Sequence, residues 1–596
     1  MATSPKKANT PISLSHRTTI PLNGEHLSTC DFMDFNIAKK MELVPGQSID
    51  VQHAVTTRLE PMVVPTFGDA QIHNKAFFVP YRTVFPAWLD FIGDVAHVYP
   101  DGSVSHVGRV PCFYLNDILY MFSLATDLRI SSSTYTPEQV DELKATDEGL
   151  ITLESFDLFF YAANDRYQGI NLSRKGRRFL KLLLSLGYTV EVVEAVGNVR
   201  VSALPLLCVG KIYLDWYYPQ AYLQDERAQI VSSYFNRDVP NFTLTKDDIY
   251  NILSVIDVVN YDNDFYTGAW DNPANSTDGS YTDINIYDVT SENPDYRIGG
   301  MNAEGTAEIS PNASLTQYGL TALRAASDYA KRNQLAGSRA IDRYLARFGV
   351  VLDAAKLNRS MFLHEYNDYI QFGDVTATAS TDTAILGDFA GKGIGYTKNS
   401  FDFSSDEYGM LFIITTIVPR IGYFQGMHRE NMHLSKLDFF TGEFDALGVQ
   451  AVSQGELFMP LNVLDRKDLI TDVTDAVFGF VPRYGHYKVG YDQLTGDYRL
   501  GRLNRGRDAW TLFRDVKQFF KDGDGVHDIN FVRGVDNDQY QRIFSYTEDG
   551  ADHFNIHHQF AIKSSFPARS LYDNYEFENE DEAKKVSLNV NGVKAN

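Results

Sequence analysis

The segment Asn74–Ile92, NKAFFVPYRTVFPAWLDFI, contains six aromatic side chains within fifteen positions and is interrupted by Pro80 and Pro86. Aromatic side chains bury more area than other residues and dominate the energetics of cores and interfaces. Proline fixes rigid corners at a low entropic cost. Because the segment contains no catalytic cluster, we expect it to pack rather than to react. Its aromatic residues are Phe77, Phe78, Tyr81, Phe85, Trp88 and Phe91.

The sequence on either side of this segment predicts strands at both ends of the chain and helices between them. Ile49–Leu59 and Phe554–Lys563 alternate between apolar and polar side chains, which is typical of strands with one buried face. Gly409–Val418 is the longest apolar stretch and predicts a buried strand. It is far too short to cross a bilayer as a helix, so we expect no membrane insertion. Helices are predicted near residues 115–125, 137–144, 176–186 and 246–254, with two more between 314 and 348.

Composition limits the classes of protein that the chain can belong to. It has 596 residues, of which 44% are hydrophobic and 13% aromatic, so a large core is available. The net charge of -23 argues against a surface that binds nucleic acid everywhere, but it leaves room for a local basic patch. The three cysteines are too far apart in sequence for a disulfide framework or a zinc site, which favours a reducing compartment. The N-terminus has no apolar stretch of the kind found in secretory signals.

No cluster in the sequence predicts catalysis, a metal centre or a cofactor. Gly391–Gly395 lacks the spacing of a phosphate loop, so a flexible turn is favoured. Asp522–Gly525 begins like a calcium loop, but Arg533 stands where an EF-hand needs a glutamate. A turn is favoured there over an adventitious divalent ion. His557 and His558 point to opposite faces of a predicted strand and cannot easily share an ion.

Basic residues gather in three groups and in a short N-terminal arm, and each could contact phosphate. One of the groups is a predicted helical stripe of Arg339, Arg343 and Arg347. The alternative is a solvated face, or salt bridges to the abundant acidic residues. The candidates for nucleic-acid contact are Lys6, Lys7, Arg174, Lys175, Arg177, Arg178, Arg499, Arg502, Arg505 and Arg507. Four further aromatic residues are expected in the core or at an interface, namely Trp216, Tyr217, Trp270 and Trp510.

The aromatic segment and several later segments resemble the major capsid proteins of the Microviridae, the small icosahedral single-stranded DNA phages. The gokushovirus-like branch and its gut relatives are the most similar. The first match is RLEPMVVPTFGDAQIHNKAFFVPYRTVFPAWLDFI, Arg58–Ile92, preceded by the turn Val44–Gly46. The later matches follow in the family's order: LPLLCVGKIYLDWYYPQ (204–220), YDNDFYTGAWDNP (261–273), residues 315–350, YFQGMHREN (423–431) and FGFVPRYGHYKVGYDQLTGDYR (478–499).

The resemblance implies a mainly β fold, the viral jelly-roll. This is an eight-stranded antiparallel β-sandwich or barrel with long insertions that contain helices and loops. One capsid domain would span residues 1–596, with strands from about 30–200 and 365–565 and insertions at about 95–185 and 205–365. Residues 566–596 would form a C-terminal tail. Phe77 and Phe78 would lie in a core strand, and the later aromatic residues of the segment would pack the next helix onto the core or a neighbouring subunit.

The resemblance also implies a function. The chain would be a major capsid protein that self-assembles into a sixty-copy T=1 icosahedral shell around a circular single-stranded DNA genome. It would be found in the virion and be assembled in the cytoplasm of the bacterial host. Implied partners are the packaged DNA, a small basic DNA-associated protein, minor or pilot and scaffolding proteins, and a receptor on the host surface. We expect the polar loop 271–313 to face the host through Asp271, Asn275, Asp278, Tyr281 and Asn293.

Two other classes of protein are compatible with the sequence. A jelly-roll of this size could bind or cleave carbohydrate, which would need an exposed aromatic groove and a close pair of carboxylates. A dedicated single-stranded DNA-binding protein is the third reading, although the acidic balance weighs against it.

Overall fold

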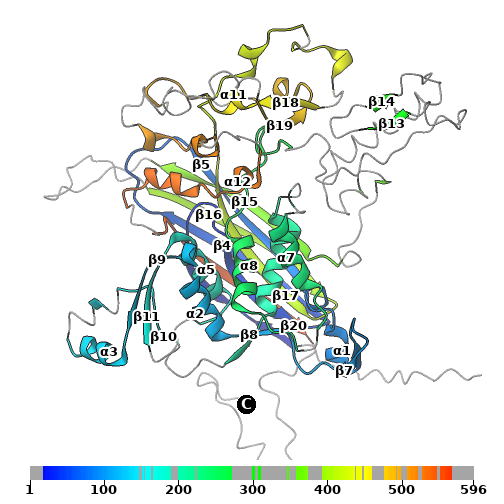
Figure 1. Cartoon of the computed structure of the whole chain (residues 1–596), viewed down its shortest axis with the longest axis vertical. Coiled ribbons are helices and arrows are strands. Elements are labelled where there is room, and N and C mark those ends of the chain that lie inside the picture. The colour runs from blue at the N-terminus through cyan, green and yellow to red at the C-terminus, as the bar shows by residue number, and fades with distance from the viewer. Residues whose placement is uncertain are drawn as a thin grey trace, which may run out of the picture.

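The structure is a computed structural model (Figure 1). It describes residues 18–146, 151–152, 155–162, 166–189, 199–219, 222, 225–239, 241–270, 298–301, 307–309, 345, 348–349, 358–373, 392–436, 438–445, 449–459, 476–490, 493–498, 507–520, 527–546 and 551–566. In this part of the chain, no helix is long and apolar enough to cross a membrane.

Eight antiparallel strands form two four-stranded sheets. The first sheet has the order β2 (Gly24–Cys30), β20 (Phe554–Phe566), β4 (Gln47–Leu59) and β16 (Lys392–Ser405), and β1 (Thr18–Pro21) extends its edge along β20. The second has the order β3 (Asn36–Leu43), β17 (Gly409–Pro419), β5 (Asp69–Pro80) and β15 (Met361–Gly373). Consecutive strands therefore mostly lie in opposite sheets, which is the connectivity of a jelly-roll.

The two sheets are joined at one corner and open elsewhere. Gln371–Gly373 of β15 pairs with Lys392–Ile394 of β16, so one hydrogen-bonded path runs through both sheets from β1 to β3. Its two ends are not paired with each other in the described residues. The mainly β sandwich is as expected, but the barrel alternative is wrong because the path does not close.

The interior of the sandwich is a compact apolar cluster supplied by both sheets. Ile49 and Val51 of β4 and Phe560 of β20 meet Phe78 of β5 and Leu411 of β17. This follows from the alternation along β4 and β20, where every second residue is buried. The apolar faces predicted for these two strands are therefore confirmed, and they are the faces that close the sandwich.

A layer of helices covers the outer face of the second sheet (Figure 1). Its members are α2 (Leu115–Leu124), α5 (Arg174–Ser185), α6 (Leu204–Ile212), α7 (Glu226–Phe235) and α8 (Lys246–Ile256). All eleven residues of β17 are buried, since the strand lies between the sandwich interior and this layer. The buried strand predicted from the apolar stretch is confirmed.

Local capping explains where several of these helices begin. The Ser173 hydroxyl accepts a hydrogen bond from the backbone N–H of Gly176 at the start of α5, and Thr245 accepts one from Asp248 in α8. The predicted helices α2, α3 (Pro137–Lys144), α5 and α8 are present. The structure adds α6, its π-helical continuation Tyr213–Tyr217 and α7, which the sequence analysis did not predict.

Smaller elements surround the sandwich. Strands β9 (Arg129–Tyr135), β11 (Arg166–Leu172) and β10 (Leu158–Ala162) form a three-stranded lobe beside α3. Another lobe contains β18 (Val449–Ser453), α11 (Gln454–Leu457) and β19 (Val477–Pro482). Other elements are α1 (Trp88–Gly93), α12 (Ile529–Val532), several short 3-10 helices and three strand pairs. The pairs are β6 (Ala96–Val98) with β7 (Val104–His106), β8 (Cys112–Tyr114) with β12 (Arg200–Ser202), and β13 (Ile298–Met301) with β14 (Ala307–Ile309).

One local prediction is wrong and others fall outside the described residues. The glycine-rich segment expected to be a turn instead enters β16, which begins at Lys392 and pairs with β4 from Ile394 onward. Glycine permits this because it leaves the ladder hydrogen bonds intact. The helices expected between 314 and 348, the loop 271–313, the calcium-like segment 522–525, the N-terminal lysines and the tail 567–596 lie largely or wholly outside the described residues.

Candidate assembly surface and nucleic-acid interface

The aromatic segment that follows β5 packs mainly inside its own chain. Tyr81, Phe85 and Trp88 are all buried, and the rings of Tyr81 and Trp88 lie 4.8 Å apart. The Tyr81 hydroxyl donates a hydrogen bond of 2.8 Å to Glu42 at the end of β3. Phe91 is half-buried against Trp88, with 5.7 Å between ring centroids. These four side chains therefore fasten α1 to the core of the chain.

Other side chains on the same corner are exposed and apolar. Leu89 is 63% exposed and Ile92 is 48% exposed on α1, and three valines follow in the next loop and hairpin. We call this set the apolar corner; it consists of Leu89, Ile92, Val95, Val98 and Val104. Figure 1 places α1 and β7 together at one edge of the molecule. These residues were not predicted as a contact surface, because single aliphatic side chains beside six aromatic ones give no distinct signal in the sequence.

The later aromatic residues predicted for the core or an interface have different surroundings. Tyr217 is buried and Trp216 half-buried, and both pack against Phe77 on the outer face of β5. The guanidinium of Arg359 lies 3.7 Å above the Trp216 ring. Trp270 joins the β18–β19 lobe through backbone hydrogen bonds with Phe480. Trp510 is half-buried at the surface.

The basic residues of α5 pair with carboxylates of the same chain. Arg174 pairs with Asp31 and with Asp538, and Lys175 pairs with Asp127 at 2.7 Å. The other pairs are Arg177 with Asp157 at 3.4 Å, Arg178 with Asp257 at 2.8 Å, and Lys181 with Asp34 and Asp552 at 3.1 and 2.6 Å. DNA contact by this helix stays a prediction, and it would have to compete with these partners.

The electrostatics of these pairs indicate a structural role. Burial alone would lower the pKa of Lys181, but the carboxylates of Asp34 and Asp552 raise it. Burial also raises the pKa of Asp31, against the opposing effect of His553 and Arg174. Charges in such surroundings are costly to leave without a partner. The pairs therefore hold α5 against the connection between β2 and β3.

The second basic group is only partly described. Arg499, Arg502 and Arg505 lie outside the described residues, as do Lys6 and Lys7. Arg507 is described, and its guanidinium carbon lies 5.4 Å from the centre of the Tyr498 ring and 5.8 Å from that of Trp510. The Phe67 ring lies 6.3 Å from the ring of Tyr498 and 6.0 Å from that of Trp510, and Phe67 is 64% exposed. This group combines exposed aromatic surface with a cation.

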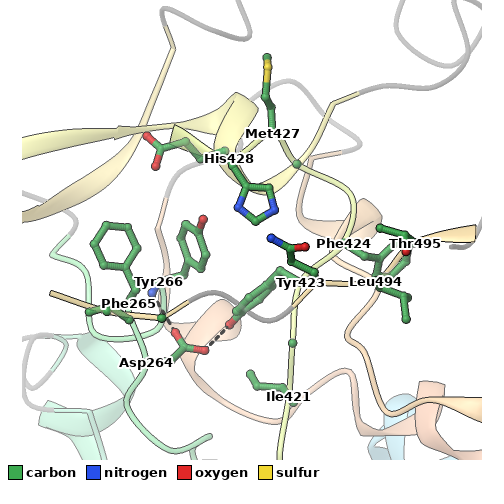
Figure 2. A pocket seen from close by; sticks show the side chains of 16 residues that line it. Asp264, Phe265, Tyr266, Ile421, Tyr423, Phe424, Met427, His428, Leu494 and Thr495 are labelled. Atoms are coloured by element: carbon green, nitrogen blue, oxygen red, sulfur yellow. Dashed lines mark hydrogen bonds between the residues drawn. The ribbon is translucent and has the colours of Figure 1, made fainter. Parts of the chain in front are cut away.

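A hollow of about 340 Å³ lies beside the β18–β19 lobe (Figure 2). The segments 264–266 and 421–428 line it, so two segments of the resemblance meet there. The Tyr423 hydroxyl donates a 2.9 Å hydrogen bond to Asp264, and Figure 2 shows this contact on one side of the hollow. A second carboxylate, Glu456, accepts from Arg429 and from the backbone of Ser453. Both carboxylates are thus engaged by groups of the chain itself.

Histidines from distant parts of the chain meet inside the sandwich. Nε2 of His53 lies 3.1 Å from Nδ1 of His558, and the Tyr366 hydroxyl is hydrogen-bonded to Nδ1 of His53. The rings of His26 and His558 stack at 5.7 Å. His558 is buried and His557 is partly exposed, which confirms that they occupy opposite faces of β20. Within the described ranges, no group of three or more histidine, cysteine or acidic residues could hold a metal ion.

The strand order and the helical cover define a jelly-roll protein, an architecture shared by viral capsid and lectin domains. Comparison with known families decides between these classes. The family described as Capsid protein (F protein) matches residues 9–109 and 233–567, and the chain belongs to this family. It is therefore a structural protein of a phage capsid and is located in the virion.

Two relatives of the chain are also named as capsid proteins. The chain is 21% identical over 531 residues to the Capsid protein VP1 of Chlamydia phage 1, covering 79% of this chain and 82% of that protein. It is 21% identical over 510 residues to the Capsid protein VP1 of Bdellovibrio phage phiMH2K, covering 79% of this chain and 80% of that protein. The predicted membership of the Microviridae capsid proteins is confirmed. The two alternatives, a carbohydrate-binding or carbohydrate-cleaving protein and a dedicated single-stranded DNA-binding protein, are set aside.

Proposed function

We propose that this chain is a single structural domain that closes, as sixty copies, into a T=1 icosahedral shell around a circular single-stranded DNA genome. The observation that carries the proposal is the apolar corner, on a subunit of a capsid family. Leu89 is 63%, Val98 64% and Val104 62% exposed in the isolated chain, although most aromatic residues of the segment Asn74–Ile92 are buried. Exposed apolar patches of this kind mark contact surfaces.

Subunit contact at this corner has a simple energetic basis. Burying apolar area contributes roughly 25 cal/mol per Å², and residues at the centre of an interface supply most of its binding energy. In a closed shell each subunit meets its neighbours around several symmetry axes, so a modest contact is repeated many times. The buried aromatic residues Tyr81 and Trp88 support the proposal by holding α1 rigidly in place.

The charge of the subunit suggests how the genome is neutralised. The chain has a net charge of -23, and the cations of α5 pair with its own carboxylates. We therefore expect phosphate contact from Lys6, Lys7 and the segment Arg499–Arg507, together with a small basic DNA-associated protein. Assembly would occur in the host cytoplasm with scaffolding and minor or pilot proteins. The loop 271–313 would meet the host receptor.

Electron microscopy of the purified chain in negative stain, combined with sedimentation, tests this proposal. We expect closed particles of one size, or rings with fivefold symmetry. If the chain stays a monomer alone, it should be co-expressed with the neighbouring genes of its phage. A chain that stays monomeric under both conditions would contradict the proposal.

A further inference from the structure

A cluster of three aromatic rings and one arginine lies at the surface beside the start of β5. The rings of Phe67 and Trp510 are nearly parallel, with 6.0 Å between centroids and an angle of 29° between planes. Tyr498 stands edge-on to Phe67 at 6.3 Å. The Arg507 guanidinium lies within 6 Å of both Tyr498 and Trp510, which is the range of a cation–π contact. We call these four residues the aromatic–arginine platform.

The platform exposes apolar surface that would be more stable if a ligand covered it. Phe67 is 64% exposed, while Tyr498, Arg507 and Trp510 are half-buried. Phenylalanine is ordinarily a core residue, and here its ring lies against other rings instead of entering the sandwich. A planar group stacking on Phe67 would remove apolar surface from water on one side only. This geometry suits a flat ligand with edges that remain in solvent.

The backbone beneath the platform is firmly held. Phe67 donates its N–H to the carbonyl of Trp510 at 2.7 Å, and the Thr66 hydroxyl donates to the carbonyl of Ala509 at 2.7 Å. The guanidinium of Arg542 donates to the carbonyls of Asp508 and Thr511, both at 3.0 Å. The rings are therefore positioned before any ligand arrives, which reduces the entropic cost of binding.

The sequence next to the platform is rich in arginine, which favours a polyanionic ligand. Four arginines occur in the nine residues 499–507, in a chain whose net charge is -23. The acidic neighbours in sequence are Asp497 and Asp508. Aromatic rings for stacking, combined with cations for the backbone, are the features by which proteins hold single-stranded nucleic acid without reading its sequence. A purely apolar contact between subunits would not need this density of guanidinium groups.

We propose that the aromatic–arginine platform is a stacking site for unpaired bases of single-stranded DNA, with Phe67 and Trp510 contacting bases and Arg507 contacting phosphate. This rests on the proposed function, because it assigns to one surface the packaged DNA expected inside the shell. It extends that function by placing base contact at the junction of β5 with the segment 507–511, and it makes binding largely independent of base sequence.

Binding of a short oligothymidylate to the purified full-length chain tests the proposal. The chain has four tryptophans, so stacking should quench the fluorescence of Trp510, and Trp510→Phe should remove this quenching. Affinity is measured separately from the anisotropy of a labelled oligonucleotide. Phe67→Ala should weaken binding roughly 5- to 100-fold. Arg507→Gln should reduce the slope of log affinity against log salt by about 0.7.

Two matched controls come from the β18–β19 lobe and its neighbourhood. The guanidinium of Arg483 lies 5.2 Å and 5.1 Å from the rings of Phe444 and Tyr484, so Arg483→Gln removes a similar contact elsewhere. Phe439 is 55% exposed, so Phe439→Ala removes a ring of similar exposure. Neither should change the affinity or the salt slope. Thermal unfolding of each variant shows that the fold is retained.

Two results would overturn the proposal. In the first, Phe67→Ala and Arg507→Gln leave affinity and salt slope unchanged. In the second, they abolish shell formation while DNA binding is unaffected, which would assign the platform to a contact between copies of this chain. Both results leave the proposed shell function intact, since that is judged from particles of the unaltered chain. The opposite combination is also informative. If the unaltered chain forms no shell, the proposed shell function is contradicted. If Phe67→Ala nevertheless weakens DNA binding, the proposed stacking site is supported.

Discussion

The imidazole rings of His53 and His558 meet inside the sandwich, with Nε2 of one 3.1 Å from Nδ1 of the other, although 505 residues separate them in sequence. They lie on the neighbouring strands β4 and β20, and each projects toward the interior. His26 and Phe560 stack around them, and Tyr366 approaches from the opposite sheet. The centre of the shell-forming fold thus contains basic groups that are neutral when folded.

This pair predicts a loss of stability in acid. Burial lowers the pKa of His53 from 6.5 to about 3 and that of His558 well below 6.5, where the nearby His53 and His26 lower it further. Between the folded pKa near 3 and the unfolded pKa of 6.5, the unfolded chain binds a proton at His53 that the folded chain does not. The free energy of unfolding is therefore highest above pH 6.5 and falls as the pH decreases toward 3. His53 alone should reduce the free energy of unfolding by about 2 kcal/mol between pH 6.5 and 5.

Urea unfolding of the subunit at a series of pH values measures this loss. The free energy of unfolding of each variant is compared with its own value at pH 7.5. In His53→Asn, the decrease in this free energy between pH 6.5 and 5 should be smaller by about 2 kcal/mol than in the unaltered chain. His557→Gln, on the other face of β20, is the matched control and should keep the full fall. Identical pH profiles for His53→Asn and the unaltered chain would contradict the prediction.

A second prediction concerns the close approach of β17 to β5. A Cβ atom at Gly409 would lie 2.5 Å from the carbonyl oxygen of Val79 and 2.5 Å from the ring of Phe78. Gly409→Ala should therefore destabilise the subunit by about 1–3 kcal/mol, because the backbone or a core ring must move. Gly442→Ala, where nothing lies within 4 Å of the added atom, should have almost no effect. If the two variants had equal midpoints of urea unfolding, the sandwich would accommodate the added methyl group at Gly409 without cost, and the prediction would be wrong.

A third prediction separates structural cations from DNA-binding ones. Arg178→Met leaves Asp257 without its partner, and both side chains are more than four-fifths buried, so the subunit should lose about 3–5 kcal/mol of stability. Lys488→Met removes the exposed pair with Asp445 and should cost at most about 1 kcal/mol. Denaturant unfolding measures both. A variant Arg178→Met with normal stability but weakened DNA binding would instead assign α5 to the nucleic acid.

A fourth prediction tests the apolar corner. Leu89→Asp combined with Ile92→Asp places two charges where we expect a neighbouring subunit, and both side chains are exposed in the isolated chain. The monomer should therefore unfold normally, while closed particles disappear from sedimentation profiles. Leu434→Asp is the control, since Leu434 is 93% exposed and far along the chain. Normal particles from the double variant would exclude this corner as a subunit contact.

The apolar patterns predicted the local elements because each depends on neighbouring residues. Ile49–Leu59 and Phe554–Lys563 alternate, and the structure makes both into half-buried strands of the sandwich. Ser173 and Thr245 cap helices that periodicity also predicted. The segment Leu204–Tyr217 was not predicted to be helical, because it is apolar on most of its sides, a pattern typical of a helix that is surrounded by other elements.

The candidate sites were less predictable because charge clusters give no information about their partners. Arg174–Lys181 has the composition of a phosphate-binding patch, yet the structure supplies carboxylates from residues as distant as Asp552. Nothing in the sequence around Phe67 predicts that its side chain is exposed. The aromatic segment was recognised as packing, but the exposed contact residues Leu89 and Ile92 were hidden among its rings.

Phe77 and Phe78 summarise the division between sequence and tertiary structure. The resemblance carried by the sequence already implied that both lie in a core strand. In a strand, neighbouring side chains point to opposite faces because they alternate along an extended backbone, and both residues are buried. Only the tertiary structure decided what each face meets. Phe78 faces Phe403 across the sandwich at 5.0 Å, while Phe77 faces Trp216 in the helical layer at 5.9 Å. The physical reason is that alternation is a local property of the backbone, whereas the partner of each face depends on contacts between segments hundreds of residues apart.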